Sequence, residues 1–292
     1  MNHHHHTHDP GNGLGTAFLL NFGFTILELI GGVWTNSVAI TADALHDLGD
    51  TISLGLAWFL GRYAEKRQDQ YYSYGYRRYS LLGALVNTIV LIVGGLIVLS
   101  EAIPRLLSPE PANAPGMIAF AIVGVIVNGL AVWRVKGERS LNAQVVAWHL
   151  LEDVLGWVAV LIVSLVLLFT DFYILDPILS VLITFYVLYN VIGNLRKTLA
   201  IFLQAVPEGI DINDIQHRLA AIEGVQSTHH THVWSLDGEH HVLTTHLVVT
   251  DEAPKTAILE VKRRAIDIAN NHDFDHVTIE IEYESEDCRL KE

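Results

Sequence analysis

The sequence predicts a membrane α-helical domain of six spans, followed by a small soluble α+β domain. The chain has 292 residues, of which 51% are hydrophobic and only 17% are charged, whereas roughly a quarter of the residues in soluble domains are charged. Six apolar runs are each long enough to cross a bilayer core, which takes roughly 20 helical residues. The charge collects after the last run, because residues 207–292 hold 18 Asp/Glu against 7 Lys/Arg, a net charge of −11 out of −14.

We therefore divide the chain into a His-rich flexible tail (1–14), a transmembrane domain (15–206) and an acidic domain (207–292). The six predicted spans cover residues 15–34, 37–61, 79–101, 114–135, 143–170 and 175–195. No cleavable signal peptide is expected, because the first apolar run is too long and follows histidines instead of Lys/Arg. The tail contains "HHHHTH" at 3–8, which is either a native metal-capturing tract or part of an expression tag; we favour the native tract.

The loops between the spans predict the orientation of the chain in the membrane. Connections on one side carry ten Lys/Arg, whereas those on the other side offer only Arg105. The ten are Arg62, Lys66, Arg67, Arg77, Arg78, Arg134, Lys136, Arg139, Arg196 and Lys197. Positive loops face the cytoplasm, so both termini and the acidic domain are predicted to be cytoplasmic.

The acidic domain reads as αββαβ, which suits a two-layer, ferredoxin-like fold. Asp211 is a helix cap, Pro254 opens a second helix, and "LDGE" (236–239) is a hairpin-type turn. The predicted elements are a helix at 211–222, strands at 225–234 and 241–250, a helix at 254–270 and a strand at 276–284. The acidic charge argues against nucleic acid as a partner, and the single cysteine, Cys288, excludes an intrachain disulfide.

Two histidines lie within the apolar region, and each has an aspartate four residues later. The pairs are His46 with Asp50 and His149 with Asp153. An offset of four residues places two side chains on one face of a helix. Two such helices facing each other would present four N/O ligands to one point, which suits tetrahedral Zn²⁺. The alternative is helix packing by polar hydrogen bonds, but charges inside a membrane are costly and usually face a cavity or a partner.

Further polar residues accompany these pairs. Asp43 shares the face of His46 and is either an outer acceptor or an entry ligand, whereas Asp47 is rotated about a hundred degrees away. Glu28 in the first span and Asn128 in the fourth either orient a ligand through a hydrogen bond or serve in packing. Both readings stay open.

These residues resemble the cation diffusion facilitator family, in particular its bacterial zinc/cobalt/cadmium efflux branch. The resemblance covers nearly the whole chain and rests on five stretches. They are "NSVAITADALHDLGD" (36–50), "YGYRRYSLLGALVN" (74–87), "WHLLEDVLGW" (148–157), "HHTHVWSLDGEHHVLTTHLVV" (229–249) and "HVTIEIE" (276–282). One departure is His230, where the family commonly has aspartate.

The resemblance implies a homodimer in the bacterial inner membrane that exchanges a divalent cation for protons and has a metal-binding cytoplasmic domain. His46, Asp50, His149 and Asp153 occupy the transport-site positions. In the cytoplasmic domain, His229, His246 and Glu282 fit the family's metal positions, and His232 and His276 are further candidates; a solvated strand histidine is an equal alternative for each. No cofactor is implied, and Zn²⁺ is expected as substrate and as a regulatory ligand.

The predicted function is therefore a proton-coupled exporter of Zn²⁺, with Cd²⁺ and Co²⁺ as further substrates, and not an enzyme. Metal binding displaces protons from histidine and carboxylate ligands, so the two compete. The alternatives are the same transporter with Fe²⁺ or Mn²⁺ as main substrate, a membrane metal sensor, and an intramembrane metallohydrolase. The hydrolase would need a general base beside an open coordination position, and the sequence has no His-Glu-x-x-His motif.

Overall fold

The computed structural model describes residues 10–135, 141–272 and 274–288. The chain forms two compact units. The first comprises residues up to 62 together with 83–195, and the second comprises 63–82 together with 196–292. Each unit is described by itself below.

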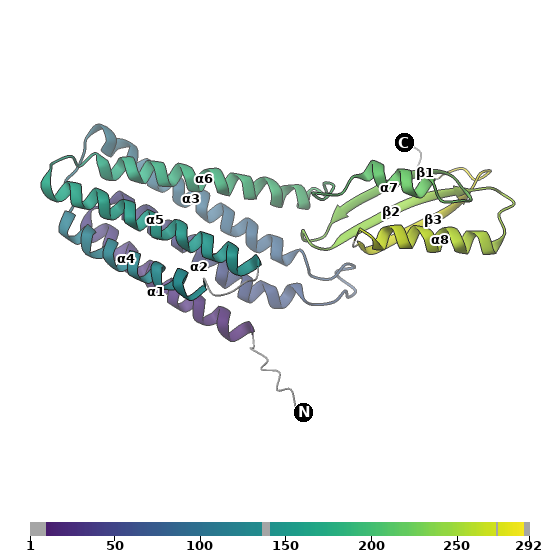
Figure 1. The fold of residues 1–292 in the computed structure, drawn as a ribbon, viewed down its shortest axis with the longest axis horizontal. Coiled ribbons are helices and arrows are strands. Elements are labelled where there is room, and N and C mark those ends of the chain that lie inside the picture. The colour runs from purple at the N-terminus through teal and green to yellow at the C-terminus, as the bar shows by residue number, and fades with distance from the viewer. Residues whose placement is uncertain (1–9, 136–140, 273, 289–292) are drawn as a thin grey trace, which may run out of the picture. The chain divides into compact units, whose positions relative to one another are not determined.

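The membrane domain is built from long helices that run alongside one another (Figure 1). Within the described residues they are α1 (Pro10–Thr35), α2 (Val38–Ala64), α3 (Tyr79–Leu107), α4 (Ala114–Val135), α5 (Leu141–Phe169) and α6 (Leu175–Phe202). α5 packs along α4, and α4 also contacts α1. Large apolar side chains such as Leu96 and Ile97 of α3 are exposed, as expected of a surface that faces lipid.

Five of these helices, in the described part of the chain, are long and apolar enough to cross a membrane: α1, α3, α4, α5 and α6. α2 is as long as the others, but Asp43, His46, Asp47 and Asp50 make its first half polar. Membrane-spanning helices are therefore confirmed, while the sixth span stays a prediction. The sequence-based tail was too long, because α1 already begins at Pro10; proline is well tolerated at the first position of a helix. The tract at 3–8 lies outside the described residues.

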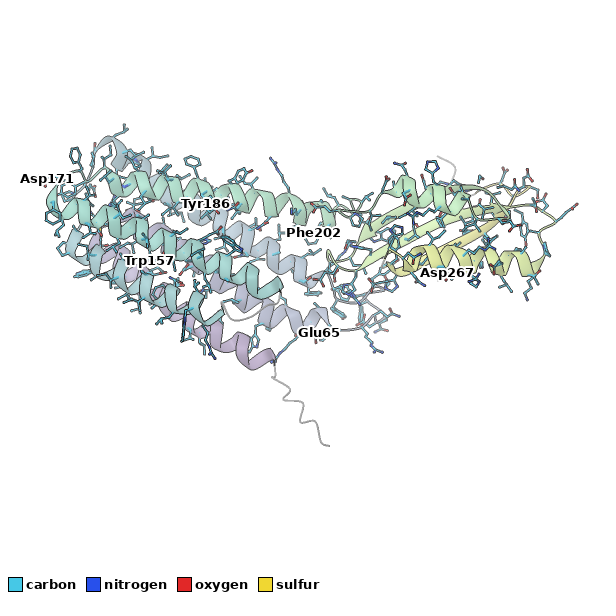
Figure 2. The ribbon with its side chains drawn as sticks, viewed as in Figure 1. Glu65, Trp157, Asp171, Tyr186, Phe202 and Asp267 are labelled. Atoms are coloured by element: carbon cyan, nitrogen blue, oxygen red, sulfur yellow. The ribbon has the colours of Figure 1, made fainter. Side chains whose placement is uncertain are left out.

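The contact between α4 and α5 depends on one glycine. Trp157 of α5 is almost completely buried, and its ring packs edge-on against Phe24 of α1. A Cβ atom at Gly124 of α4 would overlap the Trp157 indole. Small residues let membrane helices approach closely, so Gly124 sets the position of α5 against α4. Figure 2 shows Trp157 on α5 within the bundle.

The start of α2 is held by a side chain of α6. The carboxylate of Asp176 accepts hydrogen bonds from Ser37 Oγ at 2.5 Å and from the amides of Val38 at 2.7 Å and Ala39 at 3.4 Å. These amides have no partner within the helix, and an acidic group at this end is also favoured by the helix dipole. The cap ties α2 to α6 ahead of the polar residues of α2.

The second unit contains a three-stranded sheet and two helices. Its elements are α7 (Ile212–Ala220), β1 (Val225–Ser235), β2 (His241–Val249), α8 (Lys255–Asn270) and β3 (Phe274–Tyr283), in the αββαβ order predicted from the sequence. The strand order is β1-β2-β3, with β1 antiparallel and β3 parallel to β2. Ile215 of α7, Val261 of α8 and Leu243 of β2 belong to one buried core, so both helices pack against the sheet (Figure 1).

Candidate metal centres

The polar residues of α2 and α5 meet inside the helical unit. Asp50 Oδ2 lies 2.9 Å from Nε2 of His149 on α5 and 3.8 Å from Nε2 of His46 on its own helix. The two imidazole rings are 5.8 Å apart between centroids. One ligand atom from each of the three residues falls within 4.8 Å of the other two. The structure therefore brings together three of the four residues predicted to bind metal in the membrane.

Asp153 is outside this group of ligand atoms, although its carboxylate interacts electrostatically with His149 and His46. It follows His149 by one helical turn, which places it about 6 Å further along α5. The Nε2 atom of His149 bonds to Asp50 of the opposite helix instead. A metal-binding role for Asp153 stays a prediction.

The other predicted residues lie in different surroundings. Asp43 is buried. Asn128 is also buried and donates to the carbonyl of Gly124, one turn earlier in its own helix. Glu28 is completely buried beside a cavity of about 260 Å³ that Trp157 also lines.

A seam of polar side chains joins α1 to α2 next to this group. Asn21 donates to Thr51 Oγ1 at 2.9 Å, and the hydroxyls of Thr25 and Thr51 are 3.2 Å apart. Asn21 also approaches the backbone carbonyl of Asp47 at 3.4 Å. These contacts pack one side of α2 against α1. His46 and Asp50 lie on a different side of α2, which faces α5.

A second group of metal-type ligands lies on the sheet of the soluble unit. Glu282 of β3 is buried, and its two carboxylate oxygens contact different histidines. His246 Nδ1 is 2.7 Å from Oε1, and His229 Nε2 is 2.9 Å from Oε2. Cys288, which follows β3, completes a set of four ligand atoms that all lie within 4.8 Å of one another.

The ionised form of Glu282 is favoured despite its burial. Burial by itself raises the pKa of this carboxyl, but the hydrogen bonds from His246 and Cys288 and the nearby His229 lower the pKa below its usual value. Within the described part of the chain, Glu282 forms no ion pair with lysine or arginine. The negative charge is therefore available to a cation bound by the histidines.

A bulge in β1 decides which histidines reach this group. His229 lies directly opposite His246, but the register shifts between His229 and His232, and His230 has φ of +47°. Consecutive strand residues normally point to opposite faces, and a bulge interrupts that alternation. The His230 ring consequently lies 5.2 Å from the His246 ring, next to the ligand group without belonging to it.

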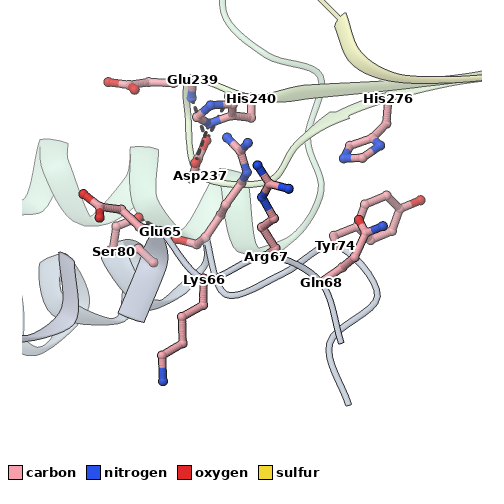
Figure 3. Close-up of a pocket in the computed structure, with 12 residues that line it drawn as sticks. Glu65, Lys66, Arg67, Gln68, Tyr74, Ser80, Asp237, Glu239, His240 and His276 are labelled. Atoms are coloured by element: carbon pink, nitrogen blue, oxygen red, sulfur yellow. Dashed lines mark hydrogen bonds and ion pairs between the residues drawn. The ribbon is translucent and has the colours of Figure 1, made fainter. Parts of the chain in front are cut away.

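The remaining two predicted histidines are elsewhere. His232 is exposed and pairs with Thr244 of β2. His276 contacts Tyr74 at 5.2 Å between ring centroids and lines an open pocket of about 1030 Å³ with Asp237 and His240 (Figure 3). Neither is part of the four-residue group. The sequence analysis did not predict Cys288 as a ligand, because it lies beyond the last strand, where no periodicity shows which way a side chain points. The signal that could have found it is a residue type that binds metal, placed shortly after Glu282.

These features define a metal-handling membrane protein. Its helical unit has candidate histidine and aspartate ligands between two helices, and its soluble unit has a ligand group of its own. Residues 14–203 match the family described as the cation efflux transmembrane domain, and residues 207–284 match the cation efflux protein, cytoplasmic domain. The chain therefore belongs to the cation efflux, or cation diffusion facilitator, family, as the sequence motifs predicted.

Relatives match along most of their length. The chain is 31% identical over 286 residues to the cadmium, cobalt and zinc/H(+)-K(+) antiporter of Bacillus velezensis, covering 96% of this chain and 91% of the relative. It is 32% identical over 283 residues to zinc transporter ZitB of Escherichia coli, covering 94% and 90%. It is 33% identical over 286 residues to metal cation efflux system protein CzcD of Cupriavidus metallidurans, covering 96% and 89%. These names describe transporters and not enzymes, as the sequence predicted.

Proposed function

We propose that this protein exports Zn²⁺, and also Cd²⁺ and Co²⁺, in exchange for protons. The observation that carries the proposal is the convergence of His46, Asp50 and His149 between two helices of a cation efflux domain. Relatives named for zinc, cadmium and cobalt support the choice of metals. A site made of imidazole and carboxylate ligands suits Zn²⁺, whereas Mn²⁺ prefers a site with oxygen ligands only.

The geometry of Asp50 supports the coupling to protons. Its Oδ2 atom is hydrogen-bonded to His149 Nε2 at 2.9 Å, so a proton lies between the two atoms that would bind the metal. Metal ligands must be deprotonated. A cation entering this site therefore displaces that proton, and protonation from the other side of the membrane expels the cation. Asp153 supplies the fourth ligand in this scheme.

We further infer that α2 is the sixth span and that the protein is a homodimer of the bacterial inner membrane with cytoplasmic termini. α2 has the length of the other spans, and its polar half faces α1 and α5 through the contacts described above. The Lys/Arg-rich connections support the orientation. We also propose that the soluble unit has a ferredoxin-like fold and binds a regulatory Zn²⁺ ion.

Transport by proteoliposomes under a pH gradient tests the proposal. Asp50→Ala is expected to reduce Zn²⁺ flux by about 100-fold or more, because even residues that only support metal ligands contribute 10–100-fold. Asp153→Ala is expected to reduce it too. Asp171→Ala is the matched control, since this exposed carboxylate lies between α5 and α6 (Figure 2). Undiminished flux in both Asp50→Ala and Asp153→Ala would refute the site.

A further inference from the structure

We propose that Cys288 is a metal ligand, and that His229, His246, Glu282 and Cys288 form a closed four-ligand site in the soluble domain. This deepens the proposed function, on which it rests for the regulatory role of a metal in this domain. The new element is the thiolate, which completes the coordination and changes the metals that the site prefers.

The four ligand atoms are already close together. They lie within 4.8 Å of one another. In a tetrahedral Zn²⁺ site, bonds of about 2.0–2.3 Å place the ligand atoms about 3.3–3.8 Å apart. The group therefore has to contract by only about an ångström around an ion. The Nε2 atom of His229 is buried and makes no hydrogen bond of good geometry within the described residues, although it lies 2.9 Å from Glu282. A cation between them would satisfy both atoms.

The segment after β3 is anchored so that Cys288 returns to the sheet. The amide of Glu284 donates to the carbonyl of Val249 at the end of β2. Ser285 donates to the carboxylate of Asp251 twice, from its amide at 3.0 Å and from its hydroxyl at 2.8 Å. These bonds reverse the chain past β3. The chain is therefore held against the end of β2 three residues before Cys288.

The chemistry of the group fits a soft divalent cation. A carboxylate and a thiolate together carry two negative charges, which would neutralise such an ion. Four protein ligands leave no open position, as in structural zinc sites and unlike catalytic ones. Thiolate favours Zn²⁺ and Cd²⁺ over Mn²⁺. The site would thus sense the metals that we propose the membrane domain exports.

Absorption spectroscopy of the full chain tests the inference directly. Cys288 is the only cysteine, so any thiolate-to-Co²⁺ charge-transfer band in the near ultraviolet must come from it. We expect the wild type to show this band on titration with Co²⁺, and Cys288→Ser to lack it. The apparent affinity for Cd²⁺ at this site is expected to fall by at least about tenfold in Cys288→Ser. His232→Ala is the matched control and should retain the band, since His232 is exposed outside the group.

Alkylation of Cys288 by a maleimide gives a second readout that does not depend on colour. Cd²⁺ should protect Cys288 in the wild type and in His232→Ala, but not in His246→Ala. Absence of the band at saturating Co²⁺, or a band that survives in His246→Ala, overturns the inference. The transport assay is separate: if Asp50→Ala loses flux while the band is absent, only the Cys288 site fails. If the band is present while the flux of Asp50→Ala and Asp153→Ala is undiminished, only the transport site fails.

Discussion

At the scale of single residues, Asp50 connects the two helices of the candidate metal site in the membrane domain. It is shared by two histidines on two helices, and His149 is the nearer, at 2.9 Å against 3.8 Å for His46. The sequence pattern paired Asp50 with His46 because they share a helix face. The structure adds that the carboxylate also crosses to α5, so loss of Asp50 would remove the link between the two halves of the site.

The small size of Gly124 allows α5 to pack closely against α4. We expect Gly124→Ala to destabilise the protein by about 1–3 kcal/mol, the usual cost of inserting a methyl group into a packed interior. The added Cβ would overlap the Trp157 ring, which is buried between the helices. Thermal unfolding of purified protein in detergent measures the effect.

Gly129→Ala is the control for this substitution. Gly129 is on the same helix, but a Cβ there would meet no atom within 4 Å. Equal unfolding midpoints for Gly124→Ala and Gly129→Ala would show that the Trp157 contact is not a constraint on α4 and α5.

At the scale of single elements, the turn between β1 and β2 is held by Asp237. Its Oδ1 accepts from the amides of Glu239 at 3.0 Å and His240 at 2.8 Å, and its Oδ2 is 2.7 Å from His240 Nδ1 (dashed in Figure 3). Partial burial raises the pKa of Asp237, but these hydrogen bonds outweigh it and leave the pKa below the ordinary value of 3.8. Gly238, with φ of +103°, provides the left-handed backbone that the turn requires.

The lowered pKa predicts how this turn responds to acid. Because the folded pKa lies below the unfolded one, the charged Asp237 stabilises the turn fully above pH 3.8, and the stabilisation is lost as the pH falls through the folded pKa. Protection of the Glu239 and His240 amides from hydrogen exchange, relative to their intrinsic rates, should therefore fall as the pH is lowered below 3.8.

Substitution of the same residue checks the origin of the protection. Asp237→Ala should speed exchange of these two amides by roughly tenfold, as expected for the loss of hydrogen bonds to a charged acceptor. Asp214→Ala, which removes an exposed ion pair with Arg218 on α7, should leave them unchanged. Protection that persists in Asp237→Ala would mean that backbone pairing alone holds the turn.

The helices and strands were largely predictable from local patterns. The strand predicted at 225–234 is β1 (Val225–Ser235), and the predicted helix at 254–270 is α8 (Lys255–Asn270). Val277, Ile279 and Ile281, at alternate positions of β3, pack against the core. The end of α3 was placed too early, at 101 and not Leu107, because Glu101 and Pro104 mark the end of an apolar run without ending the helix.

At the scale of the whole molecule, the negative charge of the acidic domain affects how two copies of the chain associate. The name of the family that matches residues 207–284 refers to dimer formation, and the acidic domain carries a net charge of −11. Two such domains repel each other, and salt screens that repulsion over about 10 Å at 0.1 M. Bound Zn²⁺ would also reduce the negative charge.

We therefore expect the full chain to be a dimer in detergent whose association strengthens with salt and with Zn²⁺. Light scattering should give twice the 32.4 kDa polypeptide mass at high protein concentration, with a dissociation constant that falls as salt is raised from low concentration. Ca²⁺ at the same concentration is the control for the zinc effect, since it prefers oxygen ligands. A monomer at every concentration, salt and metal condition would refute the dimer.

The sequence by itself determined the long helices, the αββαβ order, the pairing of His46 with Asp50 along α2, and the family. These follow from local spacing and apolar periodicity, which need no knowledge of what a helix or strand packs against. Only the tertiary structure decided that Asp50 bonds to His149 while Asp153 is set apart, that His229 and not His232 reaches Glu282, and that Cys288 joins them. Those distances depend on how two helices cross, on a bulge in β1 and on the reversal of the chain after β3, and each is a contact between segments that no local pattern encodes.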